Sequence, residues 1–350
     1  MLGAGLFASR RIDGIESDEL ACECDGVDRH AYPSAWQDSA RRSSSPRETT
    51  WVNMTNTIDK VLVAWRRRWW RPDPALLAAY DGLRPMTVVT GGSEGIGYAL
   101  ARQFAAAGHD LMLIARRPQP LSKAADRIRA EFRVEVAVVA VDITTPAAIP
   151  AIDAALAAQK AYADVLVNNA GIGLAGPFLD HAQEAIMRLL DLNVRALTEL
   201  TRHYLPGMRT RGRGGILNLA SLGGYAPGPY QAAYYASKAY VISLSEALAA
   251  EMAGQGVRIT ALVPGPAATA FHERMGGESA FYLRLLPVAD PEGIAWAGYR
   301  GFLLGWRIVV PGVFNPFLAL AMRIVPHRIV IPIIGWLLKP RGQERSDVRG

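Results

Sequence analysis

Thr90-Gly91-Gly92-Ser93-Glu94-Gly95-Ile96-Gly97 follows the short β-prone run 86–89 and opens an amphipathic stretch from Tyr98 to Ala107. Glycines let a backbone adopt positive φ and approach a ligand closely. Free N–H groups at the start of a helix then face an anion. The spacing is Gly-x3-Gly-x-Gly and not the Gly-x-Gly-x-x-Gly fingerprint, but strand, glycine turn and helix is the context a phosphate-binding loop needs. The stretch therefore predicts a phosphate-binding turn at the start of an α/β unit.

The same residues permit a second interpretation. Gly91 to Gly95 also fits Gly-x-Ser-x-Gly, the nucleophile elbow of serine hydrolases, with Ser93 as nucleophile and His272 downstream as a partner. However, the turn follows the first strong strand of the domain, so no core sheet comes before it, and the third glycine, Gly97, has no role in an elbow. We keep the hydrolase as the weaker alternative.

A second group of residues lies downstream. Tyr234 and Lys238 stand four apart, and Ser221 lies thirteen residues before Tyr234. On a helix, residues i and i+4 share one face. A tyrosine beside a fixed positive charge can exchange its proton with a substrate oxygen, as a carbonyl reductase or an alcohol dehydrogenase requires. By itself, Tyr-x-x-x-Lys is a weak signal, because helices rich in tyrosine and lysine often carry it as a surface pair.

Taken together, these residues closely resemble the short-chain dehydrogenase/reductase family over roughly residues 84–312. The resemblance implies a catalytic set of Asn193, Ser221, Tyr234 and Lys238. It also implies a nicotinamide-dinucleotide site made of Thr90, Gly91, Ser93, Glu94, Gly95, Ile96, Gly97, Arg116, Arg117, Asp142, Ile143, Asn168, Ala170, Gly171, Tyr234, Lys238, Pro264, Gly265 and Thr269.

The residue types suggest a role for each catalytic group. Tyr234 is the expected proton donor in reduction and the base in oxidation. Free tyrosine has a pKa of about 10, and the positive charges of Lys238 and the oxidised nicotinamide are expected to lower it. Ser221 should polarise the substrate carbonyl. The family resemblance implies that Asn193 holds a water linking Lys238 to solvent. The neighbouring Tyr235 is not expected to be the catalytic tyrosine, because only Tyr234 has the required spacing to Lys238 and Ser221.

The whole chain from residue 86 alternates strand-like and helix-like stretches. This alternation predicts a Rossmann-type, doubly wound α/β fold with a parallel sheet covered by helices on both faces. The ligand should then bind at the carboxyl ends of the strands. The seven expected strands are 86–90, 111–115, 136–141, 165–168, 216–219, 258–262 and 308–310.

The end of the second strand bears on the choice of cofactor. An acidic residue there would bind the ribose 2′-OH of NAD. This chain instead has Arg116 and Arg117 after Ala115, which can pair with a 2′-phosphate, and we expect no carboxylate to repel that phosphate. The sequence therefore favours NADP(H) over NAD(H).

Composition agrees with one soluble α/β domain plus extensions, and the family resemblance implies that this dehydrogenase domain spans 84–312. The chain has 350 residues, half of them apolar, and only two cysteines, Cys22 and Cys24, so we expect no metal site and a reducing, cytoplasmic location. Polar residues 1–53 are expected to be a disordered tail, and Met54 is a possible true start. The net charge is +6, but nothing resembles a nucleic-acid recognition module.

The extensions and the lid leave alternatives open. Residues 54–83 are expected to form a helical segment before the domain. The Trp65–Arg71 cluster in this segment suits a membrane interface. Alternatively, the segment is a helix that packs its tryptophans on the domain. The expected lid, Ala267–Val288, is rich in apolar residues (Phe271, Met275, Phe281, Tyr282, Leu283, Leu285 and Leu286). These residues suggest a hydrophobic carbonyl or alcohol substrate, or packing within the protein.

The C-terminal extension 313–350 contains two apolar runs shorter than the ~20 residues of a spanning helix. Peripheral membrane contact or a subunit interface fits these runs better, and the family resemblance implies a homo-oligomer. An NADP(H)-dependent oxidoreductase is the expected function. The alternative is a binding or regulatory protein that keeps the fold without turnover.

Overall fold

The computed structural model describes residue 80, residues 82–276 and residues 288–339. All of these residues belong to one compact unit within Thr55–Gly350. The expectations for the tail 1–53, the Trp65–Arg71 cluster and the lid residues 281–286 therefore lie outside the described residues.

The seven expected strands all form, and all pair in parallel in the order β3-β2-β1-β4-β5-β6-β7. Long apolar runs account for them, because a parallel sheet is buried on both faces. The strands are β1 Arg84–Thr90, β2 Asp110–Ala115, β3 Val136–Ala140, β4 Ala161–Asn168, β5 Gly214–Leu219, β6 Val257–Leu262 and β7 Ile308–Val309.

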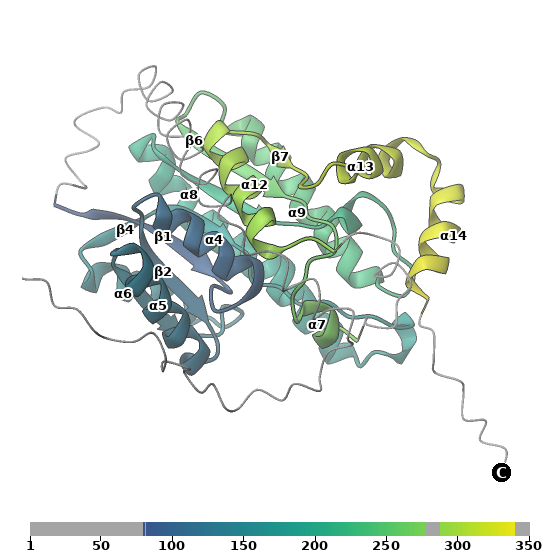
Figure 1. The fold of residues 1–350 in the computed structure, drawn as a ribbon, viewed down its shortest axis with the longest axis horizontal. Coiled ribbons are helices and arrows are strands. Elements are labelled where there is room, and N and C mark those ends of the chain that lie inside the picture. The colour runs from purple at the N-terminus through teal and green to yellow at the C-terminus, as the bar shows by residue number, and fades with distance from the viewer. Residues whose placement is uncertain (1–79, 81, 277–287, 340–350) are drawn as a thin grey trace, which may run out of the picture. The chain divides into compact units, whose positions relative to one another are not determined.

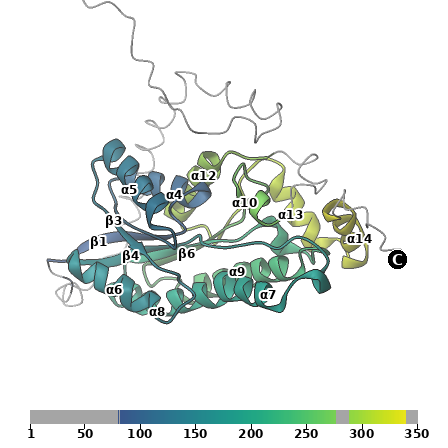
Figure 2. The same cartoon turned by 90° about the horizontal axis from the view of Figure 1, so that it is seen from below.

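Helices cover both faces of this sheet, as Figure 1 and Figure 2 show. On one face lie α4 (Gly95–Ala106), α5 (Pro118–Phe132) and α12 (Pro291–Leu304). On the other lie α6 (Ala148–Ala158), α7 (Gln183–Leu190), the π-helical turn η2 (Asp191–Ala196), α8 (Leu197–Arg211) and α9 (Ala232–Glu251). The remaining elements are η1 (Phe178–Asp180), η3 (Leu222–Tyr225), α10 (Phe271–Arg274), α13 (Asn315–Ile324) and α14 (His327–Leu338).

Each face of the sheet has its own apolar core. Phe104 of α4 lies at the centre of the first core, where its ring meets Tyr299 and Phe302 of α12 at centroid distances of 5.0 and 5.9 Å. The second core lies between the sheet and helices α6 and α8. These two layers fix the sheet, so that the loops at the carboxyl ends of its strands are held on a rigid base.

The strand order reverses between β1 and β4, which are neighbours in the sheet. In open parallel sheets, the loops that follow two such strands diverge and leave a crevice between them. The glycine turn 90–97 follows β1, and residues 169–171 follow β4. The fold therefore brings the two predicted cofactor segments to one place.

The C-terminal segment is more integrated than a separate extension. A third core joins Ala319 and Met322 of α13 and Val330, Ile334 and Leu338 of α14 to residues of η3, α9 and β6. At Gly335, an added Cβ would lie 3.3 Å from Pro229, so α14 packs closely on the loop before α9. Among the described residues, no helix is both long and apolar enough to cross a membrane.

Candidate active site

The turns after β1 and β4 are tied together by hydrogen bonds. Gly91 and Gly95 have φ values of 66° and 59°, which side-chain-bearing residues rarely adopt. The Asn169 amide donates to the carbonyl oxygens of Thr90 (3.0 Å) and Gly91 (3.1 Å). In return, the Thr90 hydroxyl accepts from the backbone N–H groups of Asn169 and Ala170. The glycine turn is thus held rigidly at the start of α4.

Gly97 is the position where this clamp leaves no room for a side chain. An added Cβ would lie 2.2 Å from Nδ2 of Asn169 and 2.3 Å from the Gly91 carbonyl oxygen. We expect Gly97→Ala to lower the free energy of unfolding by about 1–3 kcal/mol, the usual cost of overpacking. Gly293→Ala in α12 is the matched control, because its Cβ would meet nothing within 4 Å. Urea unfolding of both variants tests this, and equal stability of the two would contradict it.

Two arginines stand at the end of β2, each beside a carboxylate. Arg116 lies 3.9 Å from Asp142 and Arg117 lies 3.2 Å from Glu94. Glu94 also pairs with Arg274 of α10. The sequence run at the end of β2 lacks an acid, but the fold brings these two from the neighbouring loops. Glu94 therefore links the glycine turn, the end of β2 and the described part of the lid.

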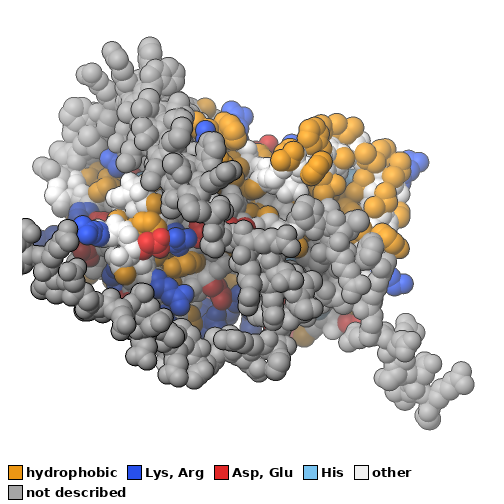
Figure 3. All heavy atoms as spheres, in the orientation of Figure 1, with side chains coloured by type: hydrophobic (Ala, Val, Ile, Leu, Met, Phe, Trp, Pro, Cys, Tyr) orange, Lys and Arg blue, Asp and Glu red, His pale blue; other side chains and the backbone are white. Residues whose placement is uncertain are grey.

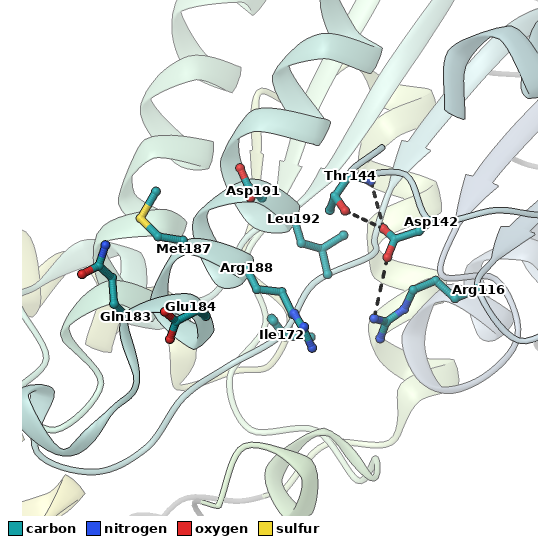
Figure 4. A pocket seen from close by; sticks show the side chains of 10 residues that line it. All are labelled: Arg116, Asp142, Thr144, Ile172, Gln183, Glu184, Met187, Arg188, Asp191 and Leu192. Atoms are coloured by element: carbon teal, nitrogen blue, oxygen red, sulfur yellow. Dashed lines mark hydrogen bonds and ion pairs between the residues drawn. The ribbon is translucent and has the colours of Figure 1, made fainter. Parts of the chain in front are cut away.

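The carboxyl group of Asp142 is held ionised by its surroundings. Burial opposes this, but hydrogen bonds from the Thr144 N–H (3.0 Å) and hydroxyl (2.8 Å) and the charge of Arg116 together lower the pKa of Asp142. Figure 4 shows Arg188 of α7 and Arg116 pointing toward one another across a hollow beside Asp142. This end of the site has cationic side chains on both sides.

The catalytic candidates gather on the other side of the crevice. Tyr234 and Lys238 lie one turn apart on α9, with the Lys238 ammonium 5.8 Å from the centre of the Tyr234 ring. Ser221 caps the start of η3, where its hydroxyl accepts from the Gly223 N–H, and it is also hydrogen-bonded to Tyr234. The Lys238 ammonium donates to the Leu219 carbonyl at 2.8 Å. The helix and the end of β5 thus place all three groups together.

Asn193 lies behind these groups in η2, and π-helical turns of this kind are frequent at functional sites. Its side-chain oxygen accepts from the Ile172 N–H, and its amide donates to the Ile172 carbonyl and to the Ser237 hydroxyl. A Cβ on Gly171 would lie 3.1 Å from the Asn193 oxygen and 3.6 Å from the Lys238 nitrogen. Asn193 therefore holds the loop after β4 against α9.

Burial sets the protonation of the two titrating groups. Desolvation raises the pKa of Tyr234 to about 12, although the hydrogen bond with Ser221 opposes the rise. Desolvation also lowers the pKa of Lys238 to about 8. The pKa of Tyr234 is therefore raised and not lowered as expected, since a charged phenolate is poorly solvated in the pocket wall. Tyr234 is consequently protonated at neutral pH, as a proton donor must be.

These groups open into one cavity of about 770 Å³. Of the predicted site residues, all but four line it; Thr90, Gly97, Asn168 and Asn193 support its wall from behind. The Asn168 amide, for example, donates to Asn218 and Thr201 inside the sheet layer.

Sequence reasoning missed three contributors to the site. Asn169 clamps the glycine turn, and Gln231 lines the cavity with its buried Nε2 lacking a hydrogen-bond partner among the described residues. The third contributor is the inner face of α13 and α14, which supplies apolar wall residues from Leu318 to Leu338. A Gln three residues before the tyrosine was a readable signal for Gln231, whereas nothing in the sequence indicated the α14 contact.

Comparison with known proteins agrees with this site. The family model for short chain dehydrogenases matches residues 85–278, which is more than half of the chain. A short chain dehydrogenase of Pseudocercospora fijiensis is 40% identical over 180 residues, covering 51% of this chain and 58% of its own length. The very-long-chain 3-oxoacyl-CoA reductase of Bos taurus is 37% identical over 186 residues, covering 52% and 59%.

A solved structure shows the same architecture. The short-chain dehydrogenase from Sphingobium yanoikuyae in complex with NADPH is 34% identical, with a TM-score of 0.61, and the match covers 67% of this chain and 92% of that one. The chain belongs to the short-chain dehydrogenase/reductase family of oxidoreductases. This assignment replaces the serine-hydrolase interpretation of Ser93. The match spans less than two thirds of the length of the two relatives described above.

Proposed function

We propose that this protein is an NADP(H)-dependent oxidoreductase that interconverts a lipophilic ketone or aldehyde and its alcohol. The observation that carries the proposal is the meeting of Ser221, Tyr234 and Lys238 with the glycine turn at one cavity. A binding protein without turnover would not need a protonated tyrosine beside a buried lysine in its pocket.

The crevice fits a nicotinamide dinucleotide. Gly91 and Gly95 at positive φ leave the start of α4 open to a pyrophosphate, and a Cβ on Gly95 would lie 3.2 Å from Thr269 across the crevice. Asp142 and Ile143 would lie at the adenine end, and Pro264 and Gly265 at the nicotinamide end. When bound, the cofactor would supply hydride in the reduction direction or accept it in oxidation.

The protein's own residues handle the oxygen of the substrate. Tyr234 donates its phenolic proton to that oxygen as the carbonyl is reduced, and takes a proton back in oxidation. The Ser221 hydroxyl donates a hydrogen bond to the same oxygen and polarises the carbonyl. The positive charge of Lys238 stabilises the phenolate that Tyr234 becomes, and Lys238 would also hold the nicotinamide ribose. Asn193 keeps the loop after β4 in place through its hydrogen bonds to Ile172 and would hold a water beside Lys238.

The preference for NADP(H) rests on the arginines at the end of β2. Arg116 and Arg117 would bind a 2′-phosphate with charge-assisted hydrogen bonds, exchanging the carboxylates of Asp142 and Glu94 for the phosphate. Because both arginine side chains are more than half exposed, they can turn toward the ligand. The NADPH complex of the Sphingobium enzyme supports the same choice of cofactor.

The cavity wall favours a lipophilic substrate. Beyond the polar groups at its base, the wall consists largely of apolar side chains from α10, α13 and α14, among them Phe271, Met322 and Leu337. The Tyr234 ring lies 5.6 Å from that of Phe271, so the reacting oxygen would bind at the end of an apolar channel. The buried Nε2 of Gln231 offers a second hydrogen bond to a substrate oxygen. A homo-oligomer remains our prediction for the assembly.

We expect the purified full-length protein to oxidise NADPH in the presence of lipophilic ketones or aldehydes, with NADH a poorer substitute. A panel of carbonyl compounds followed by loss of absorbance of the reduced cofactor measures this. Arg116→Ala/Arg117→Ala should weaken NADPH binding by about 1.5–3 kcal/mol per lost contact and NADH binding far less.

Arg133→Ala/Arg209→Ala is a control for the change in net charge, since both arginines lie outside the cavity. No turnover with any carbonyl would refute the oxidoreductase. Turnover with a wild-type preference for NADH would refute only the role of the two arginines.

A further inference from the structure

Helices α13 and α14 are apolar on two opposite faces. Their inner faces belong to the third core and to the cavity wall. Their outer faces carry further large apolar side chains at helical spacing, Phe317, Leu320 and Ile324 on α13 and Ile329, Ile333 and Trp336 on α14, all more than half exposed. Because both inner faces pack on the same core, both outer faces point away from the domain.

The space-filling view (Figure 3) shows hydrophobic atoms exposed over both helices. Hydrophobic atoms gather over α13 and α14 in Figure 3, with lysine or arginine atoms at the edge. Val313 and Phe314, just before α13, extend the exposed apolar set. We call this set, 313–336, the outer apolar surface. A contiguous apolar surface of this kind marks an interaction site, whereas single exposed apolar residues need no explanation.

Charge indicates what this surface contacts. The segment 313–339 contains Arg323, Arg328 and Lys339 but no aspartate or glutamate. Arg323 forms an ion pair with Glu246 of α9 at 3.3 Å, so Arg328 and Lys339 carry most of the positive charge of this surface. All three cations are exposed beside the apolar residues. Apolar side chains bordered by cations match the interface of an anionic bilayer, where hydrocarbon burial and attraction to headgroups act together.

A second copy of the chain fits the surface less well. In a two-fold symmetric dimer through this surface, each copy would present the same patch to the other. Arg328 and Lys339 of the two copies would then approach each other, and the segment itself offers no acid to pair with them. Like charges placed together at an interface oppose association.

The outer apolar surface is continuous with the mouth of the cavity. Ile333 is 54% exposed on the outer surface and also lines the cavity that contains Tyr234. Its neighbours Ile334 and Leu337 line the same cavity. A molecule dissolved among lipid chains at the outer surface would therefore meet an apolar path into the site.

We propose that α13 and α14 dock on an anionic bilayer through the outer apolar surface, and that the enzyme takes its substrate from the membrane. The helices lie along the interface and not across it, since α14 has 12 residues and is roughly 18 Å long at 1.5 Å per residue. The substrate class is then a membrane-partitioned carbonyl compound with a long hydrocarbon body. This part rests on the proposed function, whereas the docking does not.

The docking is tested by co-sedimentation of the full-length protein with phosphatidylcholine vesicles with and without phosphatidylserine. The test variant is Phe317→Glu/Ile324→Glu, two outer residues that are 70% and 69% exposed and lie outside the cavity wall. The matched control is Phe178→Glu/Leu179→Glu, which changes the same types of side chain at exposed positions of η1.

We expect the wild type and the η1 control to sediment with the anionic vesicles at low salt and less at high salt. The test variant should partition at least ~10-fold more weakly, because the loss of one buried side chain of this size accounts for about that factor. Thermal unfolding should show both variants folded, since exposed substitutions change stability little.

Three results would overturn the docking. The wild type could remain in the supernatant, or the test variant could sediment as the wild type does. The third result combines two measurements. Sedimentation velocity without vesicles would show a dimeric wild type and a monomeric test variant, and neither protein would bind vesicles. That result would assign the surface to a second copy of the chain.

Turnover tests the substrate path separately. The test variant should reduce a short water-soluble ketone at the wild-type rate but a vesicle-dissolved long-chain ketone more slowly. Equal rates on the vesicle-dissolved ketone would refute uptake from the membrane. Absence of turnover in every protein would refute the proposed function and leave the vesicle result to decide the docking.

Discussion

Tyr234→Phe should remove nearly all turnover while leaving the affinity for NADPH almost unchanged. The substitution removes only the hydroxyl that we propose as the proton donor, and such a general acid contributes about 10²–10⁴-fold to the rate. The ring, which lies in the cavity wall beside Phe271, stays in place. Steady-state kcat and a fluorescence titration of NADPH measure the two effects.

Tyr235→Phe is the matched control, one residue further along α9. The Tyr235 ring packs against the backbone of η3 and the loop before α9, where a Cβ on Gly223 or Gly228 would lie 3.0 or 2.4 Å from it. Phenylalanine keeps that ring, so the variant should retain turnover. A Tyr234→Phe enzyme with wild-type kcat would remove Tyr234 from the proposed mechanism.

The sheet was predictable from the sequence because apolar runs and glycine turns alternate along the chain. All seven strands form where expected, although β4 begins at Ala161 and not at Val165. The run Ala161-Tyr162-Ala163 has no strong strand propensity, and its pairing with Arg84–Met86 of β1 decides its structure. Local sequence could not supply that long-range contact.

The site was predictable to the extent that its residues lie within motifs. Glu94 shows what the motifs could not predict. The motif predicted only that Glu94 contacts the cofactor, whereas in the structure Glu94 pairs with Arg117 and Arg274 and so joins three separate segments. The apolar runs of the C-terminal segment were equally visible. That their inner faces would line the catalytic cavity depends on where α14 packs, and periodicity alone does not identify the partner of a helix face.

The protonation of the site also depended on the fold. Side-chain types suggested that Lys238 would lower the pKa of Tyr234, but the structure buries both groups, and burial opposes charge on each. The balance between burial and a neighbouring charge follows from three-dimensional packing and could not be predicted from spacing along a helix.

Lys238 should give the reduction reaction a decline in rate as the pH rises through about 8. Burial lowers its pKa to about 8, so Lys238 is charged below that pH and neutral above it. Tyr234, with a pKa of about 12, stays protonated across the same range and cannot cause the decline. The loss of the ammonium charge leaves the developing phenolate without its stabilising partner. Measuring kcat/KM for reduction between pH 6 and 10 (about the range in which Lys238 titrates) records the decline.

Two substitutions separate the charge of Lys238 from its shape. Lys238→Met should reduce kcat/KM by about 10²-fold or more at neutral pH, because removal of a preorganised charge or donor typically has an effect of this size. The same variant should show no decline in rate near pH 8. Lys238→Arg keeps the charge at every pH tested, although its planar head fits the hydrogen bond to Leu219 less well. Its residual activity should therefore be lower than that of the wild type but free of the decline. A decline near pH 8 that persists in Lys238→Arg would assign the titration to another group, because a guanidinium does not lose its proton in this range.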